Sequence, residues 1–212
     1  MIDLTGLIPE VQAAATSCPG FTAERAVLAA AIEFADMSWC LQEEHDVFDL
    51  EEGIAEYELD APLKHRITGI INVRINGEPI FPYTSAEKDR QDTDWRTATG
   101  EYPTWYLREL SPTVKLVKLY PVPLADVDDA VALLMAVSPA RNSTRIDDRF
   151  GAEHYDAIIS GAISRVLMLP NKEWTNLVTA SAYRNTFLDY AYSARNVTMN
   201  DVLRQTLDSR II

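Results

Sequence analysis

The feature that most restricts the fold of this chain is a change in the period of its apolar residues. Across residues 23–42 they recur every three or four positions, as in a helix with one buried face. Residues 54–60 instead alternate strictly between apolar and acidic side chains, as a half-exposed strand does. From residue 155 the helical spacing returns. These periods predict an α+β protein in which a β-rich part is inserted between two helical segments.

The first helical segment has recognisable breaks. A short helix is expected from Pro9 to about Thr16, because proline is tolerated in a first helical turn. Residues 17–20, Ser-Cys-Pro-Gly, interrupt it. Thr22 is then a good N-cap for a long helix that runs to about Gln42.

The middle of the chain carries strand and turn signals. Asn76-Gly77 tolerates the positive φ angles of a type I′ turn, so residues 71–75 and 80–83 are predicted to form a hairpin. Residues 104–108 and 113–120 read as a further β pair. Residues 129–137 are apolar on both faces, which suits either a helix or a strand, and the flanking Ser138-Pro139 favours a buried strand.

The second helical segment contains a corner. Residues 155–167 carry a regular helical stripe, which Pro170 cannot continue. Trp174 is expected to fold back over the pair of helices that meet at this corner. A second helix should begin near Leu177 and stop near Asn196.

The chain has 212 residues, 47% of them hydrophobic, which is enough for a substantial core. We predict that residues 1–42 and 148–196 pack as a helical bundle and that residues 43–147 form a β-rich lobe. Residues 197–212 are predicted to be a docking arm that orders on binding, because apolar residues near a chain end are seldom left in water without use. Its apolar residues are Val202, Leu203, Leu207, Ile211 and Ile212.

The charge is strongly acidic and unevenly placed. The formal net charge is −13, and residues 41–62 hold nine acids without a lysine or arginine. Such a surface repels phosphate, which argues against nucleic-acid binding through counterion release. Glu56, Glu58 and Asp60 share the outward face of the strand predicted over residues 54–60. No run approaches the ~18 apolar residues of a membrane-spanning helix.

A search for chemistry finds little. The sequence lacks the glycine-rich nucleotide motifs, the nucleophile elbow and the HExxH zinc motif. Asp147, Asp148 and His154 are the best candidates for a metal or acid–base site, but carboxylates at a helix start also cap free N–H groups, and capping is the favoured interpretation. Cys18 and Cys40, without a CxxC pair, are expected to be reduced thiols.

The order of these features resembles a known family. The motifs are "IPEVQAAATSCPGFTAERAVLAAAIEFADMSW", then "AEYEL", "INVRINGEPI", "GEYPTWYLRE" and "KLVKLYPVP", and finally "EHYDAIISGAISRVLMLPNKEWTN" with "AYRNTFLDYAYSAR". Together they resemble the head-to-tail adaptor proteins of tailed bacteriophages, the group that includes the tail tubular protein A of short-tailed phages. The resemblance covers nearly the whole chain and departs from the family pattern after Arg195.

The resemblance implies a structural virion protein without a cofactor, a metal or catalytic residues. It implies a ring of about twelve copies between the portal protein and the tail tube or nozzle, with double-stranded DNA passing through without specific binding. Glu56, Glu58 and Asp60 are the candidates for the acids that face this DNA channel. It places the chain in the neck of the virion, assembled in the host bacterial cytoplasm, with no membrane partner. Two other functions remain open: a metal-dependent hydrolase using Asp147, Asp148 and His154, and an acidic DNA mimic that inhibits a host protein.

Overall fold

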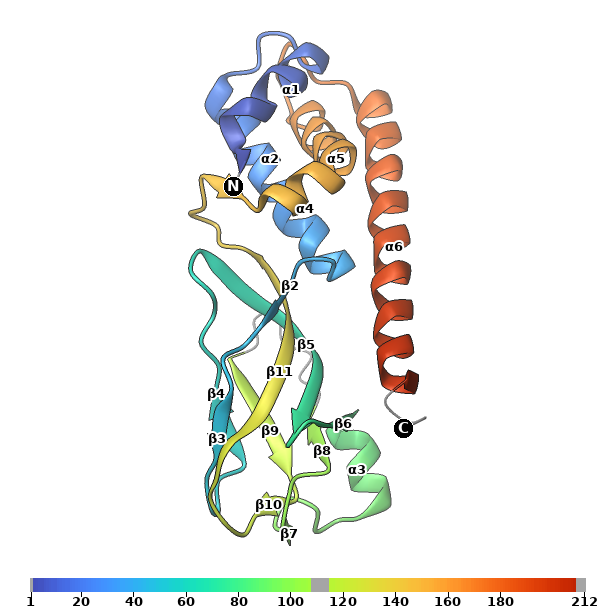
Figure 1. The fold of residues 1–212 in the computed structure, drawn as a ribbon. Coiled ribbons are helices and arrows are strands. Elements are labelled where there is room, and N and C mark those ends of the chain that lie inside the picture. Colours follow the sequence, from blue (N-terminus) through green and yellow to red (C-terminus); the bar gives the residue numbers. More distant parts are fainter. Residues whose placement is uncertain (1, 108–114, 209–212) are drawn as a thin grey trace. The chain divides into compact units, whose positions relative to one another are not determined.

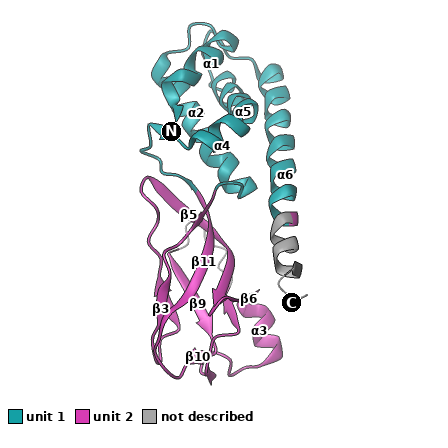
Figure 2. Cartoon of the chain, viewed as in Figure 1, with its two compact units in different colours: residues 1–41, 138–199 teal, residues 42–137, 200–212 magenta. Residues whose placement is uncertain are grey.

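The computed structural model describes the backbone of residues 2–107 and 115–208 and the side chains as far as Asn200. The fold is mixed α/β with a curled β-sheet. The chain divides into two compact units, one comprising Met1–Leu41 and Ser138–Met199 and the other Gln42–Val137 and Asn200–Ile212 (Figure 2). Residues 138–147, which the sequence analysis grouped with the β part, lie in the first unit. The cause is strand β12 (Arg145–Ile146), which pairs with β1 (Ile2–Asp3) at the start of the chain.

The first helices of unit 1 follow the predicted order with shifted ends (Figure 1). A 3-10 turn, η1 (Leu4–Leu7), leads into α1 (Ile8–Ala14), which has Pro9 in its first turn. Helix α2 spans Gly20–Ser38 and is capped by Pro19, so the predicted N-cap at Thr22 is wrong. The predicted end at Gln42 is also wrong, because Trp39 adopts a left-handed conformation, with φ 55°, and closes the helix.

Helices α4 (Asp148–Glu153) and α5 (Tyr155–Leu167) complete the compact part of this unit. The α5 stripe is buried as predicted, and α2 packs directly on α5. Phe34 of α2 lies in the centre, with ring centroids 6.1 Å from Phe150 and 5.9 Å from Phe187. This aromatic contact joins the start of the chain to its last helix.

Helix α6 spans Leu177–Asp208, so the predicted stop at Asn196 is wrong. No glycine or proline follows Asn196 before the chain's last residues, and nothing local interrupts the helix. The chain turns between α5 and α6 at the predicted corner, where Asn171 follows Pro170 and has a φ angle of 56°. The Thr175 hydroxyl donates to the Leu169 carbonyl across this turn at 2.5 Å. Trp174 is half-buried, with its Nε1 atom enclosed.

Unit 2 is built on an eight-stranded sheet with the order β2-β11-β5-β6-β8-β9-β4, and β3 also pairs with β11. The strands from the first half of this unit are β2 (Gln42–Glu44), β3 (Phe48–Leu50), β4 (Glu56–Glu58), β5 (His65–Ile75) and β6 (Glu78–Tyr83). Those from its second half are β8 (Trp105–Leu107), β9 (Leu116–Tyr120) and β11 (Val127–Pro139). A separate parallel pair joins β7 (Thr99–Gly100) to β10 (Val122–Pro123). Strand β11 confirms the prediction of a buried strand over residues 129–137.

The β5–β6 hairpin turns at Asn76-Gly77 with φ angles of 52° and 86°, which confirms the predicted turn. The polar segment after β6 forms helix α3 (Ser85–Gln91), which starts with a Thr84–Glu87 capping box. Beside α3, Trp95, Trp105 and Tyr120 form a buried aromatic cluster with centroids 4.9–5.2 Å apart. This cluster is a hydrophobic centre of unit 2.

Candidate functional site

Strand β4 presents acids to solvent and an aromatic residue to the core. Glu56 and Glu58 are exposed on either side of Tyr57, which is 8% exposed. Antiparallel pairing with β9 sets Tyr57 opposite Val117. The Tyr57 hydroxyl donates to the Ile54 carbonyl at 3.0 Å and accepts from the Glu51 amide at 3.1 Å. The hydroxyl contacts tie β4 to the loop before it. The burial of Tyr57 between the exposed Glu56 and Glu58 confirms the predicted alternation, with the carboxylates outward.

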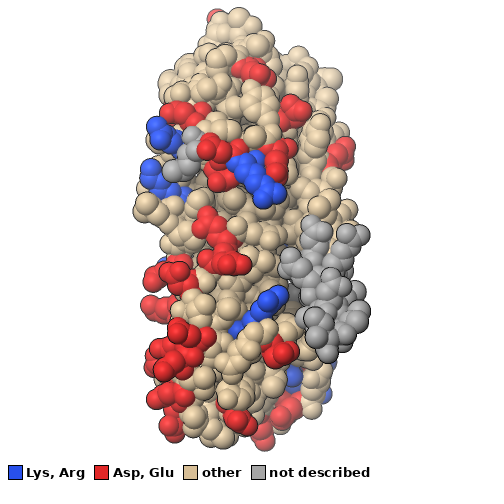
Figure 3. Space-filling model, in the orientation of Figure 1, with Lys and Arg blue, Asp and Glu red and all other residues tan. Residues whose placement is uncertain are grey.

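A hollow of about 500 Å³ lies beside this strand in unit 2. Its lining includes an aromatic floor, in which the Phe48 ring lies 5.4 Å from Tyr57 and 5.6 Å from His45. Carboxylates surround it, and Figure 3 shows acidic side chains gathered over this part of the unit. The acids that line it are Asp49, Glu51, Glu56, Glu58 and Asp60. The predicted acidic face is therefore one side of a larger acidic surface.

One lysine, which sequence reasoning missed, modifies this surface. Lys118 of β9 lies directly across the sheet from Glu56, with Nζ 2.9 Å from Oε1. Glu58 faces Leu116 instead and has no cation opposite it on that strand. An exposed pair of this kind contributes about 0.2–1 kcal/mol, so its main effect is to neutralise charge. Glu58 and Asp60 thus carry more of the repulsive field than Glu56 does.

Two acids of unit 2, Asp49 and Asp126, accept hydrogen bonds from backbone amides. Asp49 accepts a hydrogen bond from the Asp129 amide at 2.7 Å, where Asp129 has φ 50° beside a register shift between β3 and β11. Asp126 accepts from the Glu52 amide at 2.7 Å. These carboxylates hold the connections between strands while remaining exposed. The same carboxylates therefore add to the acidic surface and stabilise the connections between strands.

The alternative metal site has a capping geometry. Asp147 is the N-cap of α4, and its Oδ1 accepts from the Phe150 amide at 2.9 Å. His154 packs its ring 4.8 Å from that of Phe34, and burial lowers the pKa of His154 below its ordinary value although Glu153 opposes the shift. Among the described residues, no three His, Cys, Asp or Glu side chains lie close enough together to hold a metal ion. The cysteines are free thiols.

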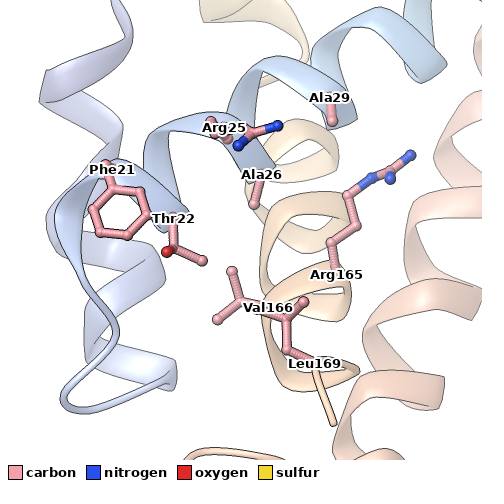
Figure 4. Close-up of a pocket in the computed structure, with 8 residues that line it drawn as sticks. All are labelled: Phe21, Thr22, Arg25, Ala26, Ala29, Arg165, Val166 and Leu169. Carbon is pink, nitrogen blue, oxygen red and sulfur yellow. The ribbon is translucent and has the colours of Figure 1, made fainter. Parts of the chain in front are cut away.

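A second hollow, in unit 1, was not predicted. It is a groove of about 320 Å³ between α2 and α5 (Figure 4). Its lining residues are Phe21, Thr22, Arg25, Ala26, Ala29, Arg165, Val166 and Leu169. The available signal was the second face of α2, where Phe21, Arg25 and Ala29 recur every four residues apart from the buried stripe.

Behind this groove, an ion triad connects three helices. Glu33 of α2 accepts hydrogen bonds from Arg165 of α5 and from both terminal nitrogens of Arg184 of α6, at 2.9 and 2.6 Å for Arg184. Burial would raise the pKa of Glu33, but the Arg184 and Arg165 contacts outweigh it and the net shift is downward. The Glu33 carboxylate therefore fixes α6 against the α2–α5 pair.

The predicted docking arm lies partly in helix α6. Val202, Leu203 and Leu207 fall within its last turns, where only the backbone is described, and Ile211 and Ile212 lie outside the described residues. Within the described part of the chain, no helix combines the length and apolar character needed to span a bilayer. Neither a protein-family model nor a curated protein sequence matches this chain.

Proposed function

We propose that this chain is a structural connector of a bacteriophage virion, a head-to-tail adaptor that forms a ring between the portal protein and the tail tube or nozzle. In this proposal the helices of unit 1 pack as a bundle that joins neighbouring copies and meets the portal, and unit 2 faces the tail. The chain acts in the neck of the particle after assembly in the host cytoplasm. It needs no cofactor and converts no substrate.

The observation that carries the proposal is the acidic surface around β4. The pairing of β4 with β9 and the burial of Tyr57 leave Glu56 and Glu58 on the outward face of the strand, and the hollow that these acids line is open to solvent. Carboxylates fixed in this way repel a phosphate backbone without offering it a hydrogen-bond donor. A surface that DNA must pass without binding requires this chemistry.

The summed charge gives the scale of the effect. Each copy carries a formal charge of −13. About twelve copies would place on the order of 150 negative charges around a ring. Because the Debye length is about 8 Å at physiological salt, only acids near the lumen would act on the DNA. Glu58 and Asp60 are the proposed lumen-facing residues, with Glu56 partly neutralised by Lys118.

The direct test is electron microscopy of purified virions labelled with an antibody against this chain. The proposal expects label at the neck and a ring of this chain's size between head and tail. Label elsewhere, or a neck density into which the two units cannot be fitted, contradicts it.

The lumenal position of Glu58 is tested separately with Glu58→Lys in assembled particles. We expect DNA release in vitro to slow, because each ring would gain about twelve cations along the channel. Glu173→Lys is the matched control, since Glu173 is exposed in unit 1 and makes the same change in charge. Equal release from both variants would contradict a lumenal position for Glu58.

The arm is tested by truncation. Thr198 of α6 is 5% exposed, so removal of residues 201–212 keeps this buried position, whereas removal of residues 197–212 does not. We expect both truncated chains to lose attachment to DNA-filled heads. Attachment that survives the shorter truncation would contradict a docking role for the last residues.

A further inference from the structure

The groove between α2 and α5 is an apolar surface left open to solvent in unit 1. Thr22 and Ala26 on α2 face Val166 on α5 and Leu169, just beyond the end of α5, across it (Figure 4). Phe21 stands at its edge with 68% of its surface exposed. An aromatic side chain stabilises a fold or an interface mainly when it is buried and its apolar surface is removed from water. The groove therefore has the character of a surface that a partner covers.

The groove also carries a positive charge on a strongly acidic chain. Arg165 contributes its aliphatic stem to the lining, while its guanidinium is engaged by Glu33. Arg25 is exposed at the groove, one helical turn after Phe21. The groove thus presents an aromatic residue and a cation four positions apart on one helix face. A complementary partner would carry an acid and an apolar ring one helical turn apart.

Helix α6 of the same chain presents that pattern. Its buried face contains Phe187 and Ala191, both 0% exposed. Away from this face, Asp189 is exposed and Tyr192 is 59% exposed, and the two are three residues apart on neighbouring positions of the helix surface. Side chains at this spacing lie about 5–6 Å apart at Cβ, as do Phe21 and Arg25. The two surfaces match in charge, apolar character and spacing.

We propose that the α2–α5 groove of one copy receives the Asp189–Tyr192 face of α6 from a second copy. Arg25 pairs with the Asp189 carboxylate, and Tyr192 packs against Phe21 and the apolar floor. The contact uses two different surfaces of the chain, so it is heterologous and repeats from copy to copy until a ring closes. This inference rests on the proposed ring and names the surfaces that build it.

The test is a charge exchange followed by sedimentation velocity of the full chain. Arg25→Glu and Asp189→Arg are each expected to weaken self-association by about tenfold or more, because like charges then face each other. The double variant restores the pair in reverse and should regain most of the affinity. Both side chains are exposed, so neither change should unfold the protein. Arg141→Glu and Glu173→Arg are the matched controls, since both positions are also exposed in unit 1.

The apolar part of the contact has its own control. Tyr192→Ala should weaken association, whereas Tyr190→Ala should leave it unchanged, because two residues turn about 200° around a helix. Tyr190 is 45% exposed, so both truncations remove a partly exposed ring. Equal effects at the two tyrosines contradict the proposed face.

Three further results, all from sedimentation velocity, overturn the proposal: a wild-type chain that stays monomeric at every concentration, single variants that associate as the wild type does, or a double variant no better than the weaker single. Virion imaging separates this failure from that of the proposed function. A neck ring that persists in Arg25→Glu particles refutes only the groove contact. Self-association with the expected charge pattern, in a chain absent from the neck, refutes only the connector function.

Discussion

Gly161 of α5 lies where three helices of unit 1 meet, and Gly161→Ala tests that packing. A Cβ atom at this position would lie 2.6 Å from Cδ2 of Phe187 on α6 and 3.0 Å from Cβ of Ala30 on α2. Phe187 and Ala30 are both 0% exposed, so neither can move toward solvent without opening the core. The substitution therefore forces one of the three helices to shift.

Two effects of opposite sign decide the result. Alanine favours a helix interior over glycine by about 0.8–1 kcal/mol. Overpacking a tightly filled core costs about 1–3 kcal/mol. Because the nearest contacts are far below van der Waals distance, we expect the packing cost to win. The difference between the two terms is a fall of up to about 2 kcal/mol in the free energy of unfolding, equivalent to up to about 8 °C in Tm for a chain of this size.

Urea denaturation followed by circular dichroism measures this change, and two further variants make it decisive. Gly20→Ala at the start of α2 is the matched control, since nothing lies within 4 Å of a Cβ there. It should be neutral or slightly stabilising. Phe187→Leu removes the ring edge, so its combination with Gly161→Ala should cost less than the sum of the single changes. A Gly161→Ala protein more stable than the wild type would refute the packing reasoning.

Three other predictions concern acids and a histidine of unit 1. The pKa of Glu33 in the folded state lies below its ordinary 4.5, so its carboxylate stabilises the fold above pH 4.5 and this stabilisation is lost as the pH falls below that value. Glu33→Gln should therefore lower the free energy of unfolding at pH 7 and make it less sensitive to acid, as measured by urea titrations at a series of pH values. Burial lowers the pKa of His154 from its ordinary 6.5, so the wild-type protein loses stability as the pH falls below 6.5. His154→Phe should remove this loss, which is measured as Tm against pH. Asp147→Ala should cost about 1 kcal/mol in thermal denaturation, because it removes an N-cap, whereas Asp147→Asn should cost less. A divalent metal that raises the Tm of the wild type, but not of Asp148→Ala, would instead favour the hydrolase alternative.

The acidic face of β4 shows what a local sequence pattern can predict and what it cannot. Strict alternation over residues 54–60 was enough to place Glu56 and Glu58 outward and Tyr57 inward, because side-chain direction in a strand has a period of two. The same pattern could not reveal Lys118 opposite Glu56, since that pairing depends on the register between β4 and β9. The charge of the face was predictable; its partial neutralisation was not.

Helix ends show a different limit. Trp39 ends α2 in a left-handed conformation that few non-glycine residues adopt, and no local signal marked it. Asn196 carries a signal that often ends a helix, yet α6 continues, with Thr198 buried one turn away from Ala194. Contacts with the rest of unit 1 outweigh a weak preference of this kind. The groove between α2 and α5 was hidden for the same reason, since its walls come from helices far apart in the chain.

The sequence by itself therefore determined the features that depend on neighbours within about four residues. These are the helical and strand periods, the Asn76-Gly77 turn, the Pro170 corner and the outward acids of β4. The tertiary structure alone decided what depends on distant segments meeting: the lysine beside Glu56, the close approach of helices at Gly161 and the open groove at Phe21. A chain's local pattern specifies which faces are apolar or charged. Only packing selects which of those faces meet and which stay open to a partner.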